Sequence, residues 1–254
     1  MDKRVRARRR IVGRQRGHRR ATLAVVIALL LVCAALFLWL RASDVFAVKR
    51  VTATSTEHVT QEEIYQATVT ARGVSLLRLS TGTIKANLSA LPYVRSVEVH
   101  RRFPDTLEVR LVEYAPVARV RTGSGEVWFV AEDGRVLGKA VAATLPLVVT
   151  AAEISPVPGK NLPAVVAGAL SLAQLVVARD APQALPAIDH IAVSSGGGLM
   201  VVFEGGTELR LGEPQELEQK LTVAASIIEQ YLRDGKQLLY VDASVPDRVA
   251  VNAE

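Results

Sequence analysis

Four histidines are the first candidates for catalysis or metal binding. His18, His58, His100 and His190 are scattered along the chain, and no two of them have the spacing of a helical zinc motif. Asp189 precedes His190, but no further acid or histidine lies nearby in the sequence to complete an acid–base or metal site. The histidine pattern therefore predicts neither a bound metal ion nor a catalytic histidine.

Serine, glycine and glutamate motifs point the same way. Gly123-Ser124-Gly125 lacks the strand-to-helix turn of a nucleophile elbow. Gly159-Lys160 lacks the Ser or Thr of a phosphate-binding loop, and Gly196-Gly197-Gly198 is followed by neither a helix nor a lysine. Glu62-Glu63 stands at a predicted helix start, where acids complement the helix dipole. We therefore expect no catalytic residues, no cofactor and no small-molecule substrate, so that the chain is not an enzyme.

The positive charge of the chain is concentrated in its first twenty residues. The net charge is +6, yet residues 1–20 hold ten Lys and Arg against one acid, and the remainder holds 21 basic and 24 acidic residues. Aromatic residues make up only 5% of the chain, too few for a surface that stacks on bases. The sequence therefore predicts a mildly acidic body with a basic tail and no nucleic-acid binding, although the tail alone leaves that alternative open.

An uncharged run of twenty residues, Ala21–Leu40, follows the tail. A helix of that length spans about 30 Å, the thickness of the hydrocarbon core of a bilayer. The basic flank predicts a cytoplasmic N-terminus and an extracytoplasmic body. A cleaved signal peptide is the alternative, but the run is longer than the usual ~7–15 residues and lacks a small-residue cleavage site. The prediction is an uncleaved anchor that contacts membrane lipid through Ala21–Leu40.

A second run of low charge, Leu162–Ala178, has two interpretations. It contains Pro163 and Gly168 and is shorter and less hydrophobic than the first run. We interpret it as a largely buried helix of a soluble domain. A second membrane span is the alternative, and it would return the C-terminus to the cytoplasm.

The first part of the body has the order strand, helix, helix, strand, strand. A strand is expected over Phe46–Ala53, followed by a helix from Gln61 to about Val69 that starts with a capping box of Thr60 and Glu63. The remaining predicted elements are a helix near Thr83–Leu91, strands around Val97–Val99 and Leu107–Val112, and the connecting turn Arg101–Asp105. We assign Phe103, Pro104 and Asp105 to forming this turn rather than to contacting a partner.

From Ala115 onward the pattern favours strands. A hairpin is expected around Asp133-Gly134. An amphipathic helix is expected over Glu216–Leu232, with one face formed by Leu217, Leu221, Ala224, Ala225, Ile228 and Leu232. The other predicted strands are Leu147–Val149, Ile188–Val193, Leu199–Phe203, Thr207–Leu211, Leu238–Ala243 and Arg248–Val251.

In this order the chain resembles the FtsQ/DivIB family of bacterial cell-division proteins. The resemblance is carried by Val45–Val48, Leu91–Val99 with Arg102–Leu107, Val112–Ala118, Leu209–Gly212, Lys220-Leu221 and Tyr240–Asp242. Ala53-Thr54 and Glu113-Tyr114 depart from the usual family pattern. The resemblance implies an α+β fold with one N-terminal transmembrane helix, a POTRA domain (β-α-α-β-β) and a β-rich C-terminal domain with flanking helices. The expected domains are a basic cytoplasmic tail (1–20), a transmembrane helix (21–40), a POTRA domain (45–114) and an FtsQ-type β domain (115–254).

The resemblance also implies a function. It predicts a single-pass scaffold of the divisome that is essential for septum formation, located in the cell membrane at the division septum with its C-terminal body extracytoplasmic. The implied partners are FtsB-like and FtsL-like bitopic proteins and other divisome components, some of which could dock on the POTRA domain. Two other functions stay open: a POTRA-containing membrane-tethered transport or assembly module, and an anchored cell-envelope enzyme.

The last predicted strand is the candidate partner site. A terminal strand has a free edge unless something covers it, and a free edge can accept a partner strand. In the resembling family the C-terminal strand and the preceding helix receive FtsB. Carried over by region, the partner-binding residues are Tyr240, Val245, Asp247, Arg248, Val249, Ala250, Val251 and Asn252.

Overall fold

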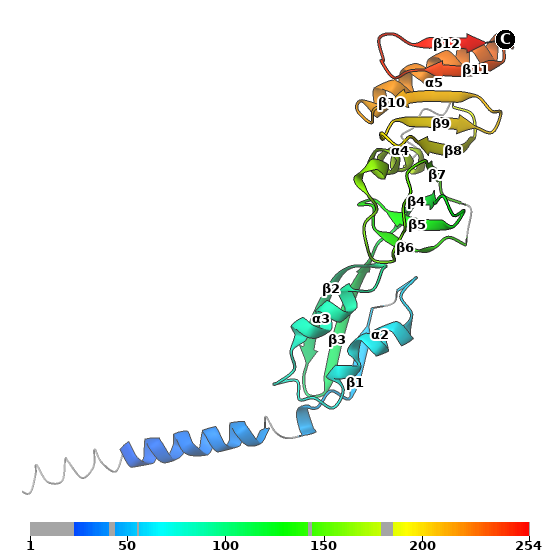
Figure 1. Cartoon of the computed structure of the whole chain (residues 1–254). Helices are drawn as coiled ribbons and strands as arrows, with labels where there is room; N and C mark the ends of the chain where they lie inside the picture. Colours follow the sequence, from blue (N-terminus) through cyan, green and yellow to red (C-terminus); the bar gives the residue numbers. More distant parts are fainter. Residues whose placement is uncertain (1–22, 41–43, 55, 142–143, 179–184, 254) are drawn as a thin grey trace, which may run out of the picture. The chain divides into compact units, whose positions relative to one another are not determined.

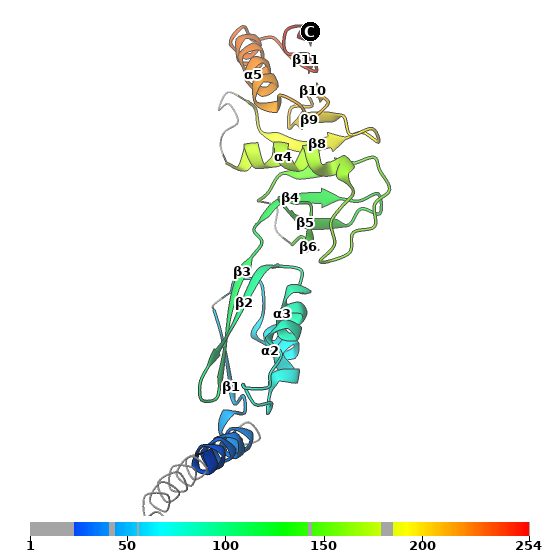
Figure 2. The ribbon, with the colours of Figure 1, turned by 90° about the vertical axis from the view of Figure 1, so that its left-hand side faces the viewer.

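Figures 1 and 2 show the computed structural model of the chain, which describes residues 23–40, 44–54, 56–141, 144–178 and 185–253. The predicted basic tail, residues 1–20, and the first residues of the predicted span lie outside the described residues. The folded chain divides into two compact units. One comprises residues 1–55, 64–87 and 98–110, and the other comprises residues 56–63, 88–97 and 111–254.

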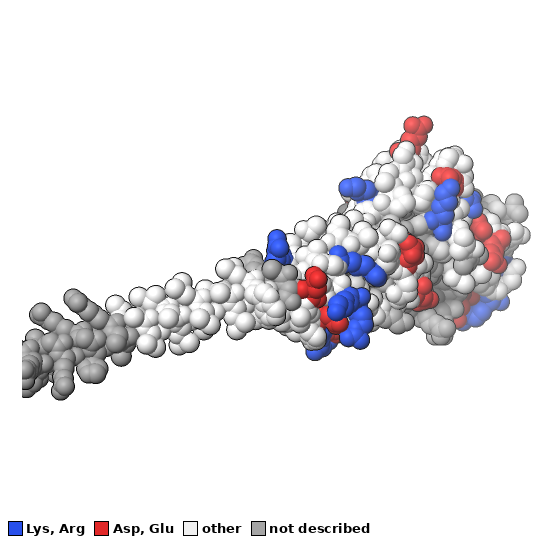
Figure 3. All heavy atoms as spheres, turned by 90° about the horizontal axis from the view of Figure 1, so that it is seen from below, with Lys and Arg blue, Asp and Glu red and all other residues white. Residues whose placement is uncertain are grey.

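The apolar helix Leu23–Leu40 has 18 residues and is fully exposed within the molecule. Figure 3 shows it as a stretch without charged side chains, whereas side chains of both signs cover the folded part. Among the described residues it is the one helix that is long and apolar enough to cross a membrane. Its length and composition therefore fit the predicted anchor.

A three-stranded sheet with the order β1-β3-β2 carries the predicted strand, helix, helix, strand, strand sequence. Its strands are β1 (Arg50–Ala53), β2 (Val94–Arg102) and β3 (Thr106–Glu113), and β1 runs parallel to β3. The accompanying helical segments are η1 (Asp44–Phe46), α2 (Gln61–Thr68), η2 (Val69–Ala71) and α3 (Thr81–Ser89). Helix α3 ends two residues before Leu91 because a residue that precedes proline disfavours the helical conformation.

The predicted capping box starts α2. The Thr60 N–H donates to Glu63 Oε2 at 2.8 Å, and the Glu63 N–H donates to Thr60 Oγ1 at 3.2 Å. Val59 and Ile64, on either side of the cap, are both buried. Two N–H groups that the helix cannot satisfy are thus bonded locally, which is why the start of this helix is predictable from four residues.

A mixed nine-stranded sheet makes up most of the C-terminal half, with the order β12-β11-β10-β9-β8-β7-β4-β5-β6. Its strands are β4 (Pro116–Arg121), β5 (Val127–Ala131), β6 (Val136–Lys139), β7 (Leu147–Thr150), β8 (Ile188–Val193), β9 (Leu199–Phe203), β10 (Glu208–Gly212), β11 (Leu238–Asp242) and β12 (Ala250–Ala253). The hairpin at Asp133-Gly134 is confirmed, with Gly134 at φ 85°. Strand β4 had no specific prediction, although it pairs with both β5 and β7.

Two helices connect parallel strands of this sheet. The segment η3 (Ala164–Val166) and α4 (Ala167–Val177) join β7 to β8, and α5 (Leu217–Arg233) joins β10 to β11. Parallel neighbours need such a crossover because a short turn reverses the chain direction. The interpretation of Leu162–Ala178 as a buried helix is confirmed, since four residues of α4 are buried in the core and the helix is too short to span a membrane.

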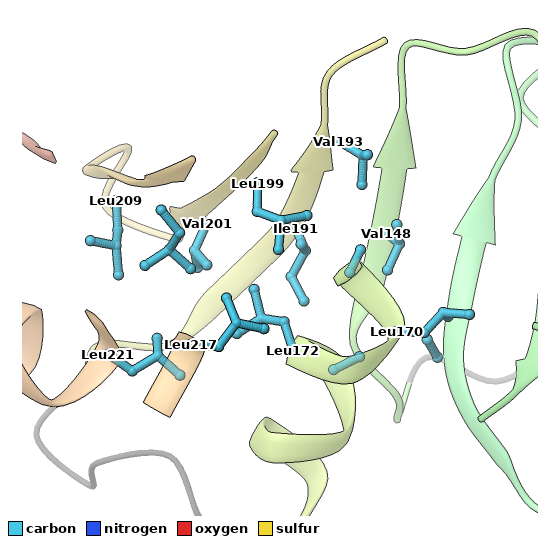
Figure 4. Packing of buried hydrophobic residues seen from close by; sticks show 14 of the residues in the cluster. Val148, Leu170, Leu172, Ile191, Val193, Leu199, Val201, Leu209, Leu217 and Leu221 are labelled. Atoms are coloured by element: carbon cyan, nitrogen blue, oxygen red, sulfur yellow. The ribbon is translucent and has the colours of Figure 1, made fainter. Parts of the chain in front are cut away.

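One hydrophobic cluster joins the sheet to both helices. Figure 4 shows Leu172 of α4 and Leu217 and Leu221 of α5 beside the side chains of the strands. Phe203 is the largest fully buried side chain among the described residues and belongs to this cluster. Burial of α5 ends at Ile228, and Leu232 is 56% exposed. The apolar face predicted for this helix is therefore buried only as far as Ile228, and its last member, Leu232, is exposed.

Candidate partner-binding edge of the sheet

The nine-stranded sheet has two edges, β6 and β12, and the first of them is partly covered. At β6, the Val136 N–H donates to the Lys160 carbonyl at 2.9 Å, and the Gly159 N–H donates to the Val136 carbonyl at 2.8 Å. Arg135 and Asn161 form a further bridge at the same place. The segment 159–161 thus satisfies the main-chain groups of Val136, at the start of β6, which a partner strand would need at this edge.

Strand β12 is the open edge. It pairs with β11 on one side, and no other described segment pairs with its second side (Figure 1). The strand begins at Ala250, two residues later than predicted. Val245, Asp247, Arg248 and Val249 instead belong to the connection, where the Arg248 N–H donates to the Val245 carbonyl at 3.0 Å. Four of the eight predicted partner residues therefore lie in the connection between β11 and β12, because the turn at Pro246-Asp247 extends through Arg248.

Side chains at the edge alternate between the core and the solvent. Val249, Val251 and Ala253 are half-buried and pack against the hydrophobic cluster, whereas Ala250 and Asn252 are exposed. This period of two is that of a strand with one covered face. The packing of Val251 and Ala253 holds β12 against the molecule while its second side stays open.

The register shows which main-chain groups of β12 face the open side. The Ala243 N–H donates to the Arg210 carbonyl of β10 at 2.8 Å, so the alternate residues Tyr240 and Asp242 turn their main-chain groups toward β12. Their partners in the register are Asn252 and Ala250, respectively. Ala250 and Asn252 therefore bond to β11, and the N–H and carbonyl of Val251, which lies between them, point to the open side.

Tyr240 and α5 flank this edge from opposite faces of the sheet. Val241 is fully buried on the face that carries the helices, so its neighbour Tyr240 lies on the other face. There the Arg210 guanidinium lies 4.5 Å from the centre of the Tyr240 ring and pairs with Glu208 at 2.9 Å. A strand added beyond β12 would direct alternate side chains toward Tyr240 and toward α5.

Exposed apolar side chains gather in the segments next to the edge. Leu239 is 41% exposed, Val245 is 52% exposed, and Leu232 is more exposed than either. Sequence reasoning included Val245 but missed Leu232 and Leu239. The period of two that buries Val241 and Ala243 would also bury Leu239, so the exposure of Leu239 follows from the register shift between Leu238 and Tyr240 and not from the sequence pattern. Likewise, nothing in the helical pattern separates Leu232 from its buried neighbours.

Comparison with known proteins decides the family. Residues 46–114 match the family described as "POTRA domain, FtsQ-type", and residues 118–244 match "Cell division protein FtsQ/DivIB, C-terminal". The chain belongs to the FtsQ/DivIB family. The resemblance predicted from the sequence is thereby confirmed, together with the fold class.

Several relatives carry the name "Cell division protein FtsQ". That of Anaeromyxobacter sp. (strain K) is 31% identical over 216 residues, which cover 82% of this chain and 72% of the relative. Those of Geobacter sp. (strain M21) and Mycobacteroides abscessus are 28% and 27% identical, covering 77% and 83% of this chain and 72% and 67% of the relatives. The family and the apolar helix together indicate a single-pass membrane protein of cell division. The family match ends at residue 244, so β12 lies beyond it.

A buried lysine near the start of α5 bonds this helix to the end of β10 in this FtsQ/DivIB chain. Lys220 is only 4% exposed, and its Nζ donates to the Leu211 carbonyl at 2.9 Å and to the Glu213 carbonyl at 2.8 Å. The Leu211 carbonyl lies in the last part of β10, and the Glu213 carbonyl lies directly after the strand. A buried ammonium is tolerated here because it is hydrogen-bonded by two carbonyl oxygens.

Replacing Lys220 with methionine should lower the free energy of unfolding by about 1–3 kcal/mol, because the apolar side chain leaves two carbonyls without a donor. Lys236→Met is the matched control, since Lys236 is exposed and a surface substitution changes stability by roughly 0.5 kcal/mol or less. Denaturant unfolding of the full chain in detergent, followed by circular dichroism, measures both. Equal stability of the two variants would contradict the anchoring role of Lys220.

Asp242 shapes the exit from β11. Its carboxylate accepts the Ser244 N–H at 3.0 Å. Hydrogen bonds from the side chain and the main chain of Ser244, with a smaller contribution from the charge of Arg210, hold the pKa of Asp242 below its ordinary value. The carboxylate therefore fixes the first turn of the connection that leads to β12.

His18 lies outside the described residues, and the other residues considered for catalysis form no metal-binding cluster in the described part of the FtsQ/DivIB fold. His190 Nδ1 and Asp189 Oδ2 are 2.7 Å apart, but the Asp189 side chain is 61% exposed. Within the described ranges, no three His, Cys, Asp or Glu side chains gather where they could hold a metal ion. Gly197 adopts φ 85° in the turn between β8 and β9, in agreement with a tight turn.

Proposed function

We propose that this chain is a scaffold of the divisome whose β12 edge binds an extended segment of an FtsB-like partner, which travels with an FtsL-like protein. The chain acts without catalysing a reaction, and it is essential for septum formation. Its anchor, the apolar helix, keeps the N-terminal tail in the cytoplasm and the folded part outside. The proposed domains are the tail (1–20), the span (21–40), the POTRA domain (45–114) and the β domain (115–254).

The open side of β12 carries this proposal. At the β6 edge, residues 159–161 occupy the main-chain groups of Val136, whereas the β12 edge offers the main-chain groups of Val251 to an incoming strand. Main-chain bonds supply affinity in strand addition, and pockets for alternate side chains supply specificity. Leu239 and Val245 are exposed beside the edge and provide apolar contacts for such side chains.

The two rival functions lack a specific observation in their favour. A transport or assembly module would be favoured by further POTRA domains, and the family comparison matches one such domain, at residues 46–114. An envelope enzyme would need convergent acids, histidines or a serine in a pocket. The Asp189–His190 pair, whose Asp189 side chain is exposed, joins no third His, Cys, Asp or Glu in a metal-binding group within the described residues.

Localisation and depletion in dividing cells test the proposal. The fluorescent label belongs at the N-terminus, so that the β12 edge stays free. We expect a band at the septum and filamentous cells when the chain is depleted. Uniform envelope fluorescence together with normal division after depletion would contradict the proposed function.

A further inference from the structure

The turn between β2 and β3 lies beside the chain that leaves the apolar helix. The Phe46 and Phe103 rings meet edge to face with their centroids 5.8 Å apart. The Lys49 N–H donates to the Asp105 carbonyl at 2.9 Å, and the Arg50 guanidinium pairs with the Asp105 carboxylate at 3.1 Å. Residues 46–50 therefore hold the 101–105 turn in place.

A third segment, residues 72–79, joins the same end of this unit. The Val48 N–H donates to the Val74 carbonyl at 3.0 Å, and the Leu76 N–H donates to the Phe46 carbonyl at 2.7 Å. The Arg101 guanidinium donates to the Leu79 carbonyl at 2.8 Å. Three segments that are distant in the sequence thus form one end of the unit.

The chain keeps this end close to the apolar helix. Five residues separate Leu40 from Phe46, and an extended chain advances at most about 3.3–3.6 Å per residue. Phe46 therefore lies within about 20 Å of the end of the helix, however the intervening residues run. The headgroup regions add roughly 10–15 Å to the two sides of the ~30 Å hydrocarbon core together, so this end is within reach of one of them.

Apolar side chains are exposed on all three segments. Val45 is 53% exposed, Val74 is 36% exposed and Phe103 is 56% exposed. The turn-forming role expected for Phe103 does not require its ring to be exposed, because Pro104 and the bonds to Asp105 already shape the turn. One exposed phenylalanine and two exposed valines on these joined segments form an apolar surface, and exposed apolar surfaces often mark sites of interaction with proteins or membranes.

Basic side chains surround this apolar surface. The three segments and their borders carry six of them, Lys49, Arg50, Arg72, Arg78, Arg101 and Arg102, against two acids, Asp44 and Asp105. Arg50 is paired with Asp105 and Arg102 with Glu108, Arg72 lies over the Tyr65 ring, and Arg101 bonds to the Leu79 carbonyl. Lys49 and Arg78 form no ion pair within the part of the chain that the structure describes. An excess of basic groups is attracted to anionic lipid headgroups.

We propose that this end of the unit, the Phe103 patch (Val45, Val74, Phe103 and the six basic residues), rests on the outer surface of the membrane. The aromatic ring and the valines enter the interfacial layer, which favours aromatic side chains, and the basic groups contact anionic headgroups. The patch would restrict the orientation of the POTRA domain at the membrane. This inference rests on the anchoring by the apolar helix that is part of the proposed function.

Quenching by brominated lipids tests the proposal. The full chain is reconstituted in bilayers of phosphatidylethanolamine and phosphatidylglycerol with bromine near the headgroup end of the acyl chains. Trp39 and Trp128 are replaced with phenylalanine, and Phe103→Trp serves as the reporter, with Val45→Trp as a second reporter in case the first does not fold. We expect each reporter to lose most of its emission. Without phosphatidylglycerol the loss should be smaller, and an equal loss would overturn the role of the basic groups.

Two control chains separate the outcomes. Val112→Trp places the reporter at a 54% exposed position of β3, six residues or about 20 Å along the strand from Thr106, and should keep its emission. A chain that retains Trp39 alone reports on the anchor. Quenched Trp39 with unquenched reporters at 103 and 45 would overturn the patch and leave the anchor intact. Unquenched Trp39 would overturn the anchor itself, and the patch with it.

Discussion

Replacing Val251 with proline should weaken binding of the FtsB-like partner about tenfold or more, the equivalent of about 1.4 kcal/mol or more. The Val251 N–H points to the open side of β12, so proline removes a donor that an incoming strand would use. Proline is tolerated in an edge strand when its missing N–H faces solvent. The fold should therefore survive while the docking edge is blocked. Co-purification of the full chain with its partner, followed by titration in detergent, measures the loss.

Two matched variants separate the main-chain group from the side chain and from the strand. Val251→Ala shortens the half-buried side chain but keeps the N–H, and should retain partner binding. Ala250→Pro removes a bond to β11 and should detach β12, which limited proteolysis of the C-terminus reports. A Val251→Pro chain that captures the partner as well as the wild type, with β12 still protected from protease, would refute strand addition.

Replacing Glu113 with alanine should lower the free energy of unfolding by about 2–3 kcal/mol, because it leaves partly buried N–H groups without an acceptor. The Glu113 carboxylate accepts the N–H groups of Glu57 and His58 at 3.2 Å and of Val59 at 2.8 Å, and it meets His58 Nδ1 at 3.2 Å. The His58 ring in turn stacks on Tyr93 with centroids 4.5 Å apart. This carboxylate thus accepts hydrogen bonds from three consecutive main-chain N–H groups.

The contribution of Glu113 should depend on pH in a defined direction. Burial raises the pKa of this carboxyl, but the hydrogen bonds from Val59, His58 and Glu57 outweigh burial and hold the pKa below its ordinary value. A carboxyl with a depressed folded-state pKa stabilises the fold above the unfolded-state pKa of about 4.3, and that stability is lost as the pH falls through the folded-state value. The difference between wild type and Glu113→Ala should therefore shrink in acid.

Thermal unfolding of the full chain in detergent at pH 7 and at successively lower pH measures this difference. Glu108→Gln is the control on the same strand, because its carboxylate bonds to the exposed Arg102 and Arg110 and should matter little to stability. A constant difference between wild type and Glu113→Ala across the acid range would show that the charge of Glu113 contributes nothing.

Short-range patterns of the sequence predicted much of this molecule. The uncharged run, the capping box at Thr60 and the Asp133-Gly134 hairpin all depend on residues close together in the chain, so no tertiary information was needed. The strands β8 to β10 follow from alternation between glycine-rich turns for the same reason. The open edge was expected in the last strand because that strand is terminal, whereas the involvement of Tyr240, Ala250, Val251 and Asn252 was carried over from the family resemblance and stays a prediction.

Tertiary structure decided the features on which docking depends. The parallel pairing of β10 with β11 joins strands that are distant in the sequence. The register that places Asp242 opposite Ala250 is set across a long turn. A shift of one residue in the register exchanges the main-chain groups that face each side of a strand. Only the paired structure therefore shows that the N–H and carbonyl of Val251 point to the open side of β12. The cover over β6 and the exposure of Leu232 likewise depend on which elements end beside them. Local propensity determines where helices and strands form, whereas the neighbours brought together by packing determine which of their groups stay free.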